Sequence, residues 1–368
     1  MKSIILIPSY QPNEVLPLLC KALKECDFKV VVVDDGGGER FQSIFEETKK
    51  YADVLGYEKN QGKGFALKYG FKYIYENYKE CKSVITADGD GQHRILDIQK
   101  VDDYFNKYNC TIIGTRVFDV PIPLRSKVGN DMSKFTQALG TYKYSRDNQC
   151  GLRLFKYEDL PLLISIQGNR YEYEMNVLSE IQLKEIKYLC VKVATIYEPE
   201  NSTSHFRPLM DTLKIQGSIL LKSLPALIGS IVLCVISSIF LYIVLPNANI
   251  TFDLMLSILA GFASCFVVQS ALTLLIYKPR NFLVSLLRNF AYTFITSVSF
   301  LITSLLFTRL LGLHLIISYL LTIVIFVFPF YFLIKLNTLL KSDIEDKWLA
   351  LLKINHYIIW VWKLMKLL

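Results

Sequence analysis

Two aspartates separated by a single glycine follow a short apolar run in the stretch VITADGDGQH, residues 84–93. Asp88 and Asp90 could present two carboxylates at the end of a buried strand, and oxygen ligands of this kind suit Mg²⁺ or Mn²⁺. A cation held there could bridge two phosphates and neutralise charge on a departing diphosphate. Asp and Gly are also common turn residues, so an ordinary surface turn is the alternative interpretation.

A second candidate for phosphate chemistry is the stretch NQGKGFALKYG, residues 60–70. Gly62 and Gly64 flank Lys63 where a helical pattern begins, and backbone amides at a helix start favour anions. The alternative is a plain loop-to-helix join with a solvated lysine. The pattern G-x-x-x-x-G-K-[ST] is absent, and no G-x-G-x-x-G follows the first predicted strand. These absences disfavour a P-loop NTPase and a Rossmann dehydrogenase.

The elements that must position these residues alternate between strand and helix patterns. We predict strands at 3–7, 29–33, 53–57, 83–87 and 110–114, with helices near 13–25, 39–50, 64–78 and 95–107. The alternation predicts an α/β domain with a largely parallel sheet that is covered on both faces. Ligands of such sheets bind beyond the carboxyl ends of the strands. Polar groups cluster at four of these ends: residues 8–10, residues 34–35, Asp88 with Asp90, and residues 114–116.

The second half of the chain is far more apolar than the first. The mean hydropathy of +0.32 over 368 residues comes mainly from residues 224–336. Four stretches there, near 225–245, 254–277, 289–311 and 314–336, are each about long enough to cross a bilayer, which takes about 20 residues. Basic residues flank the spans on one side, so the positive-inside rule predicts that both termini and the first domain are cytoplasmic. Four buried helices of a large soluble core are the alternative.

Charge and cysteine content narrow the function classes. The formal net charge of +8 could suit nucleic acid, but the basic residues flank the predicted spans, which favours anionic lipid surfaces and no nucleic acid. The eight cysteines include no C-x-x-C pair, so neither a zinc site nor a disulfide framework is indicated. The first apolar run is too short for a signal peptide. We therefore expect an integral protein of the cell membrane.

The runs IPSYQPNE, VVVDDGG, NQGKGFALKYG, DGDGQH and GTR, in this order, resemble the family 2 glycosyltransferases with a GT-A fold. The resemblance covers about residues 3–215. Within that family, DNQCGLRLF, RYEYEMNVL and YEPENSTSHFRPLMDTLKI are similar to the polyprenyl-phosphate and dolichyl-phosphate sugar transferases. The apolar second half resembles the GtrA-like four-helix membrane proteins.

The resemblance implies a domain order along the chain. A GT-A domain would occupy residues 1–204, followed by an amphipathic interfacial helix or linker over 205–223. A GtrA-like membrane domain with the four predicted helices would span 224–338. Residues 339–368, which carry tryptophans among lysines, would form a C-terminal interfacial helix.

The resemblance also implies roles on the donor side. The nucleoside pocket would be lined by Pro8, Tyr10, Glu14 and Asp35, with Asp35 on the base and Lys63 near the nucleotide. The metal and diphosphate site would be formed by Asp88, Asp90 and Gln92, with Asp90 as the principal ligand of Mg²⁺ or Mn²⁺. A loop that carries His205 and Arg207 would close over the donor.

On the acceptor side, Asp147 and Gln149 would face the sugar or the acceptor and act in catalysis together with Asp90. Arg116 and Arg125 would bind the acceptor phosphate. The stretch KVGND offers two rivals to Arg125, namely Lys127 and Asn130. Asp147 could also be an ordinary turn residue.

These features predict a metal-dependent, inverting transferase that moves one sugar from a UDP- or GDP-sugar to a polyprenyl phosphate. A phosphate monoester is already ionised near neutral pH, so it can attack the anomeric carbon without a strong general base, while arginines clamp it. One alternative is a processive polysaccharide synthase, which usually carries Q-x-x-R-W, whereas this chain has no Arg-Trp pair. Another is a non-catalytic nucleotide-binding domain on a lipid-sugar flippase. The sequence leaves open whether the chain forms a homo-oligomer.

Overall fold

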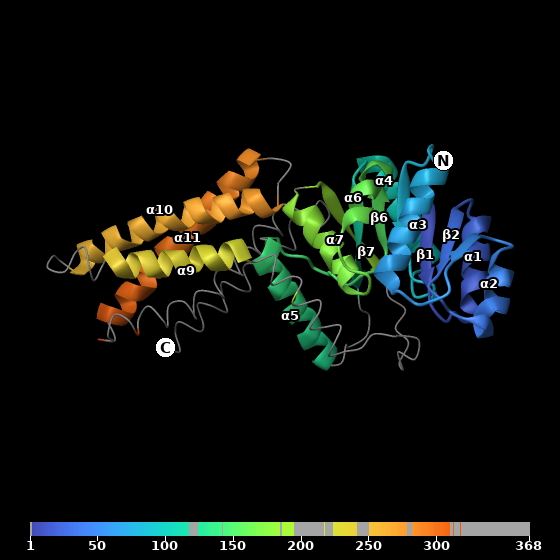
Figure 1. Ribbon diagram of the computed structural model, residues 1–368, viewed down its shortest axis with the longest axis horizontal. Coiled ribbons are helices and arrows are strands. Elements are labelled where there is room, and N and C mark those ends of the chain that lie inside the picture. The colour runs from blue at the N-terminus through green and yellow to red at the C-terminus, as the bar shows by residue number, and fades with distance from the viewer. Residues whose placement is uncertain are drawn as a thin grey trace. The chain divides into compact units, whose positions relative to one another are not determined.

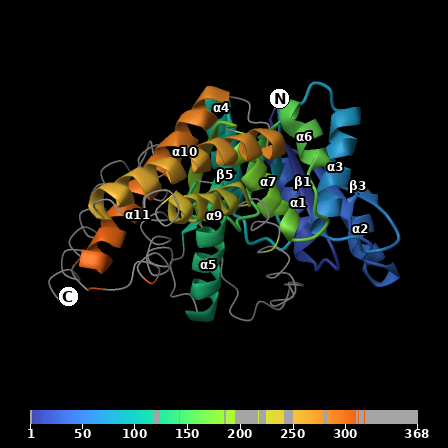
Figure 2. The ribbon, with the colours of Figure 1, turned by 60° about the vertical axis from the view of Figure 1, so that its left-hand side comes forward.

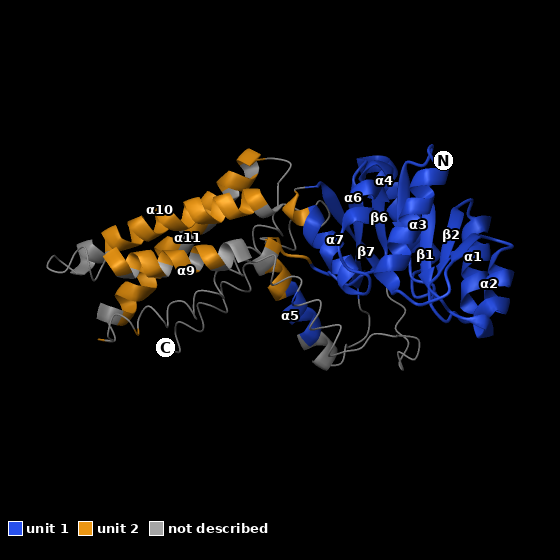
Figure 3. Ribbon diagram, viewed as in Figure 1, with its two compact units in different colours: residues 1–134, 146–181, 186–219 blue, residues 135–145, 182–185, 220–368 orange. Residues whose placement is uncertain are grey.

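The computed structural model describes residues 2–117, 124–141, 143–184, 186–194, 224–240, 250–277 and 282–309, with single positions 217, 312 and 317. The chain divides into two compact units (Figure 3). The first comprises Met1–Lys134, Arg146–Ile181 and Ile186–Ile219, and the second Phe135–Ser145, Gln182–Glu185 and Leu220–Leu368. The first unit holds most of the polar part of the sequence, and the second holds the apolar part.

The first unit is built on a seven-stranded sheet with the order β3-β2-β1-β4-β6-β5-β7. Its strands are β1 (Ile4–Ser9), β2 (Lys29–Asp34), β3 (Asp53–Gly56), β4 (Ser83–Thr86), β5 (Thr111–Val117), β6 (Arg153–Lys156) and β7 (Tyr188–Ala194). β6 runs antiparallel to β4 and β5, and the other neighbours are parallel. The predicted α/β class with a mostly parallel sheet is confirmed, and β6 and β7 are additions that the sequence patterns did not predict.

Helices lie on both sides of the sheet (Figure 1 and Figure 2). One apolar cluster contains residues of α1 (Val15–Glu25), α2 (Gln42–Thr48) and α4 (Ile95–Tyr108). The other contains residues of α3 (Lys63–Asn77), α6 (Leu160–Ser165) and α7 (Glu172–Leu183). Val30 and Val32 of β2 belong to the first cluster, and Val31 and Val33 to the second. A strand buried on both faces is therefore a continuous apolar run, as parallel sheets require.

The helix predicted over 39–50 is split. Residues Glu39–Phe41 form a 3₁₀ turn, η1, and α2 starts only at Gln42. The turn begins at Gly38, whose φ of +83° suits glycine. A second 3₁₀ turn, η2 (Tyr157–Asp159), leads from β6 into α6, and α5 (Leu124–Thr141) follows β5.

The described part of the second unit is helical. It contains α9 (Leu224–Ile239), α10 (Ile250–Tyr277) and α11 (Phe282–Arg309), and α10 packs beside both of the others. Among the described residues, one helical segment, Met255–Leu275, is long and apolar enough to cross a membrane. The predicted fourth span and the C-terminal helix lie outside the described residues apart from Ile317, and so does the linker apart from Gly217. The four-span arrangement stays a prediction.

In these three helices polar side chains are buried and many large apolar side chains are exposed, which is the reverse of the first unit. Polar side chains lie inside: Thr293 donates to Gln269 at 3.2 Å, and Asn289 donates to Thr273 at 3.3 Å, all four being buried. Large apolar side chains lie outside, among them Leu259, Leu275 and Leu283 with 61%, 73% and 61% of their surface exposed. An exposed surface of large apolar side chains is unfavourable in water, whereas helices in a lipid bilayer associate through polar side chains buried between them.

Candidate active site

The two aspartates of DGDGQH follow β4 at the carboxyl edge of the parallel strands. Asp88 Oδ1 lies 2.7 Å from the ammonium of Lys63, and Asp88 Oδ2 lies 3.4 Å from His93 Nε2. Asp90 Oδ1 accepts the backbone N–H of Gln92 at 3.0 Å. The chain therefore brings together two of the predicted phosphate-binding motifs, the aspartate pair and the lysine at the start of α3.

The ammonium of Lys63 is shared between two carboxylates. It lies 2.7 Å from Asp88 Oδ1 and 2.9 Å from Glu174 Oε2 on α7. Burial disfavours the charged ammonium, but the two carboxylates outweigh burial and raise the pKa of Lys63 above its usual value. Lys63 is therefore a permanent cation at the beginning of α3, next to Gly62, whose φ is +102°.

The two aspartates have different electrostatic surroundings. Burial raises the pKa of Asp88, but Lys63 and His93 outweigh it and hold that pKa well below its usual range. For Asp90, burial and the negative charge of Asp88 raise the pKa above its usual value. A carboxylate destabilised in this way by a like charge is stabilised by a cation that binds both groups.

Asp35 is buried, and its carboxylate is occupied by donors of its own chain. It is 2% exposed, and it accepts hydrogen bonds of 2.7–3.1 Å from the hydroxyl of Tyr57, the amide of Asn60 and the backbone N–H groups of Gln61 and Gly62. These donors belong to the segment that leads into Lys63. In this structure Asp35 anchors the NQGKG loop, so a contact with a nucleobase would have to displace one of these donors.

The other residues predicted for the nucleoside pocket lie near the end of β1. Pro8 and Tyr10 are partly buried, and Glu14 is exposed just before α1. Tyr10 accepts a hydrogen bond from Gln11 at 3.2 Å. Pro8 lies within β1, the strand next to β2 and β4, and Tyr10 and Glu14 lie in the loop that leads from β1 to α1.

Arg116 and Asp147 form a two-pronged ion pair. Arg116 Nε lies 2.7 Å from Asp147 Oδ2, and Arg116 Nη2 lies 3.0 Å from Oδ1. Asp147 also accepts the backbone N–H groups of Arg116 and Gln149 at 3.1 and 3.0 Å. Burial raises the pKa of Asp147, but Arg116 outweighs it and lowers that pKa below the usual value. Asp147 is thus an anion committed to one arginine, while the side chain of Gln149 is exposed.

Comparison with known proteins identifies the family of the chain. The family described as "Glycosyl transferase family 2" matches residues 4–160. An uncharacterized protein of Methanocaldococcus jannaschii is 30% identical over 208 residues, which are 54% of this chain and 89% of the relative. The chain belongs to glycosyltransferase family 2. The family expected from the motifs is therefore confirmed.

Two further proteins are similar to this glycosyltransferase. The dolichyl-phosphate beta-glucosyltransferase of Saccharomyces cerevisiae is 25% identical over 224 residues, which are 50% of this chain and 64% of that protein. A crystal structure of glucosyl-3-phosphoglycerate synthase from Mycobacterium tuberculosis, in complex with Mn²⁺, UDP and glucosyl-3-phosphoglycerate, has a TM-score of 0.46 and 13% identity, covering 60% of this chain and 78% of that one. The likeness of the second half to GtrA-like proteins stays a prediction.

The residues of the glycosyltransferase fit a divalent cation that is held jointly with a nucleotide. Within the described part of the chain, no three His, Cys, Asp or Glu side chains form a metal-binding group. Mg²⁺ commonly takes one or two carboxylates and completes its shell with water and phosphate oxygens. Asp88 and Asp90 can supply those carboxylates, with the partly buried Gln92 beside them.

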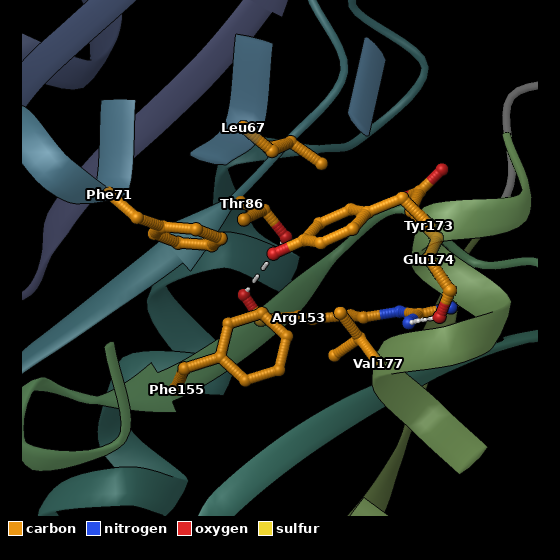
Figure 4. A pocket seen from close by; sticks show the side chains of 8 residues that line it. All are labelled: Leu67, Phe71, Thr86, Arg153, Phe155, Tyr173, Glu174 and Val177. Carbon is orange, nitrogen blue, oxygen red and sulfur yellow. Dashed lines mark hydrogen bonds between the residues drawn. The ribbon is translucent and has the colours of Figure 1, made fainter. Parts of the chain in front are cut away.

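Arg153 is a residue of the site that the sequence analysis missed. It is 2% exposed, and it donates to the backbone carbonyls of Cys150, Asn148 and Glu174 at 2.9, 3.1 and 2.5 Å. Figure 4 shows it reaching toward Glu174 in a small pocket walled mainly by core side chains. Arg153 thereby ties the loop that carries Asp147 to α7.

Gly151 belongs to the same loop and lies directly against the side chain of Asp88. A Cβ atom there would lie 2.6 Å from Asp88 Oδ2, closer than any side chain can approach. The motif CGLR therefore packs its glycine against the first aspartate and buries its arginine behind it. The only signal in the sequence is the stretch DNQCGLRLF itself, which does not reveal these contacts.

The remaining predicted acceptor residues are only partly placed. Arg125, Lys127 and Asn130 lie in α5, but the side chains of Arg125 and Lys127 are outside the described residues, and Asn130 is partly buried. His205 and Arg207 also lie outside the described residues. The roles of these five residues stay predictions.

Proposed function

We propose that this glycosyltransferase moves one sugar from a UDP- or GDP-sugar to a polyprenyl phosphate, with inversion at the anomeric carbon. The observation that carries the proposal is the commitment of the buried Asp147 to Arg116. An acceptor hydroxyl needs a free general base, and this carboxylate is not free. A phosphate monoester needs none because its second pKa is about 6, and arginines can clamp it.

On the donor side, the diphosphate would bind where Asp88 and Asp90 meet Lys63. A Mg²⁺ or Mn²⁺ ion held by Asp88 and Asp90, with Gln92 beside them, would supply charge neutralisation to the departing diphosphate. Lys63 adds its ammonium at the N-terminus of α3, where backbone N–H groups point at anions. The nucleoside would then extend toward Pro8 near the end of β1 and toward Tyr10 and Glu14 in the loop that follows it.

The second unit would anchor the enzyme in the membrane that holds the acceptor. The polar interior and apolar exterior of α9, α10 and α11 support this role, because lipid is the solvent that such a surface suits. The name of the yeast relative includes a dolichyl phosphate, which supports a lipid-phosphate acceptor. The proposed location is the cell membrane, with the catalytic unit and both termini cytoplasmic.

A pair of matched acceptors tests the proposal. The purified full chain would be incubated with Mn²⁺ or Mg²⁺, a panel of radiolabelled UDP- and GDP-sugars, and either polyprenyl phosphate or the corresponding polyprenol. We expect label in the organic phase with the phosphate and none with the alcohol. Asp90→Asn should abolish transfer, whereas Asp103→Asn, an exposed aspartate of α4, should not. Transfer to the alcohol, or no transfer from any donor, would refute the proposed acceptor.

A further inference from the structure

Glu174 faces Lys63 from α7, although neither its sequence position nor the family resemblance assigned it a role. We propose that Glu174 is a positioning residue that retains Lys63 when Asp88 turns from the lysine to the divalent cation. This inference rests on the proposed function, because it assumes that a cation and a nucleotide diphosphate bind at Asp88 and Asp90.

One ammonium, that of Lys63, contacts two carboxylates. Lys63 Nζ is 2.7 Å from Asp88 Oδ1 and 2.9 Å from Glu174 Oε2. The Lys63 and Glu174 side chains are only 21% and 13% exposed. A buried ammonium that loses its sole counter-charge is strongly destabilised. Because Lys63 has two partners, it can release Asp88 and still remain paired.

The backbone holds Glu174 in a fixed place relative to the start of α3. The backbone N–H of Phe65 donates to the carbonyl of Asn169 at 2.9 Å. A Cβ atom on Gly64 would lie 2.4 Å from Tyr173 Cβ, so α3 and the beginning of α7 approach more closely than side chains would permit. Glu174 therefore reaches Lys63 from a helix that cannot move away without breaking this contact.

A second connection fixes Glu174 relative to Asp88. The carbonyl of Glu174 accepts a hydrogen bond from Arg153 Nη1 at 2.5 Å (Figure 4). Arg153 Nε also donates to the carbonyl of Cys150. The next residue, Gly151, packs directly against the carboxylate of Asp88. Both carboxylates that pair with Lys63 are thus connected to the segment Cys150–Arg153, one by the Arg153 hydrogen bond to Glu174 and the other by contact with Gly151.

The consequence concerns the affinity of the site for the cation. With Glu174 present, Asp88 can bind a cation while Lys63 keeps one counter-charge and remains available to a donor phosphate. Without Glu174, Asp88 is the only carboxylate paired with Lys63 among the described residues, and a cation that binds Asp88 leaves the ammonium without a counter-charge from the protein. Loss of the Glu174 charge should therefore weaken cation binding rather than merely loosen the fold.

Binding of Mn²⁺ in the presence of UDP or GDP, followed by the electron paramagnetic resonance signal of the free ion, tests the inference without using activity. We expect Glu174→Gln to raise the Mn²⁺ concentration at half-saturation about tenfold, and Glu174→Asp, which keeps the charge, to stay within about threefold of the wild type. The control is Glu158→Gln, which removes an exposed carboxylate that also pairs with a lysine, Lys156. An unchanged midpoint in Glu174→Gln, with only a lower melting temperature, would overturn the inference.

A double-mutant cycle shows whether Glu174 acts through Lys63. In a Lys63→Met background the effect of Glu174→Gln on the Mn²⁺ midpoint should shrink to less than about twofold. An equal effect in both backgrounds would show that Glu174 acts independently of Lys63 and would also overturn the inference. Glu174→Ala serves if the amide variant does not fold. No Mn²⁺-dependent nucleotide binding by the wild type would overturn the proposed function itself, which separates the two failures.

Discussion

Replacing Asp147 by asparagine tests the ion pair on which the proposed acceptor site depends. The substitution keeps the size of the side chain but removes the charge that faces Arg116, and it turns one acceptor oxygen into an N–H donor aimed at a guanidinium. Asp147 is 7% exposed and Arg116 is 23% exposed, so water can only partly replace what is lost. The Asp147→Asn variant should therefore be less stable than the wild type.

The magnitude follows from the burial of the pair. Breaking a buried ion pair by removing one partner costs about 3–5 kcal/mol, and the remaining exposure of Arg116 favours the lower end, about 3 kcal/mol. For a unit of roughly 150–250 residues this corresponds to a fall in the melting temperature of about 6–12 °C. The assay is thermal unfolding of the full chain in detergent at neutral pH, with Asp103→Asn as the exposed control.

The pH dependence gives a second and independent test. Arg116 lowers the pKa of Asp147 in the folded state, so this pair contributes its full stability above the unfolded pKa of about 3.9 and loses it as the pH falls through the lower folded value. The difference between wild type and Asp147→Asn should be constant from about pH 5 to about pH 8 and shrink below about pH 4. A melting temperature within about 2 °C of the wild type at neutral pH would refute the reasoning.

Three further outcomes are expected. Gly151→Ala should lower transfer activity at least about tenfold, because the added Cβ would displace the carboxylate of Asp88. The control is Gly129→Ala, whose Cβ would meet nothing within 4 Å and which should leave activity unchanged. Equal transfer rates for the two variants would contradict the argument that Gly151 packs against Asp88. Asp35→Asn should lower the free energy of unfolding by about 2 kcal/mol and weaken nucleotide binding, since it removes the charge that holds the loop before Lys63. Urea unfolding measures the stability, and calorimetry measures the nucleotide affinity. An unchanged nucleotide affinity would contradict the expected effect on binding. Chelation with EDTA should abolish sugar transfer and added Mn²⁺ should restore it, and transfer that persists in the chelator would argue against the cation.

The fold of the first four strands could be predicted because their residues carry a local signal. The runs SIILI and KVVVV are apolar on both faces, and the helices between them repeat with helical spacing. β6 has no such signal. Its four residues, RLFK, begin with an arginine that donates to the carbonyls of Asn148 and Cys150 in the preceding loop and of Glu174 on α7. Its burial depends on this loop and on the packing of α7, which no local pattern reveals.

The sequence predicts the motifs of the candidate site but not which charged side chains contact one another. The types and spacing of Asp88, Asp90 and Lys63 indicate phosphate and cation chemistry from the sequence alone. Glu174 cannot be distinguished from Glu172 by sequence, because only the packing of α7 on α3 decides which carboxylate meets Lys63; Glu172 instead accepts backbone N–H groups of residues 169 and 170. The sequence analysis places Asp35 on the nucleobase. The hydrogen bonds that its carboxylate accepts from residues 57–62 become visible only in the structure.

The antiparallel strand β6 separates the sheet into two parts that differ in their place along the chain. The four neighbouring strands β3, β2, β1 and β4 are all contained in residues 4–86, whereas β5 joins them only through β6. Thr86 at the end of β4 pairs with Arg153 at the start of β6. Because β6 is antiparallel, the loop with Asp147 lies at the same edge of the sheet as Asp88 although it precedes its strand, whereas Asp88 follows β4. We therefore expect the part of the sheet formed by β1, β2, β3 and β4 to fold during synthesis before β6 and β7 have been translated. Pulse proteolysis of ribosome-stalled chains that end after α4 would show a protected core, and complete digestion would exclude this order of assembly.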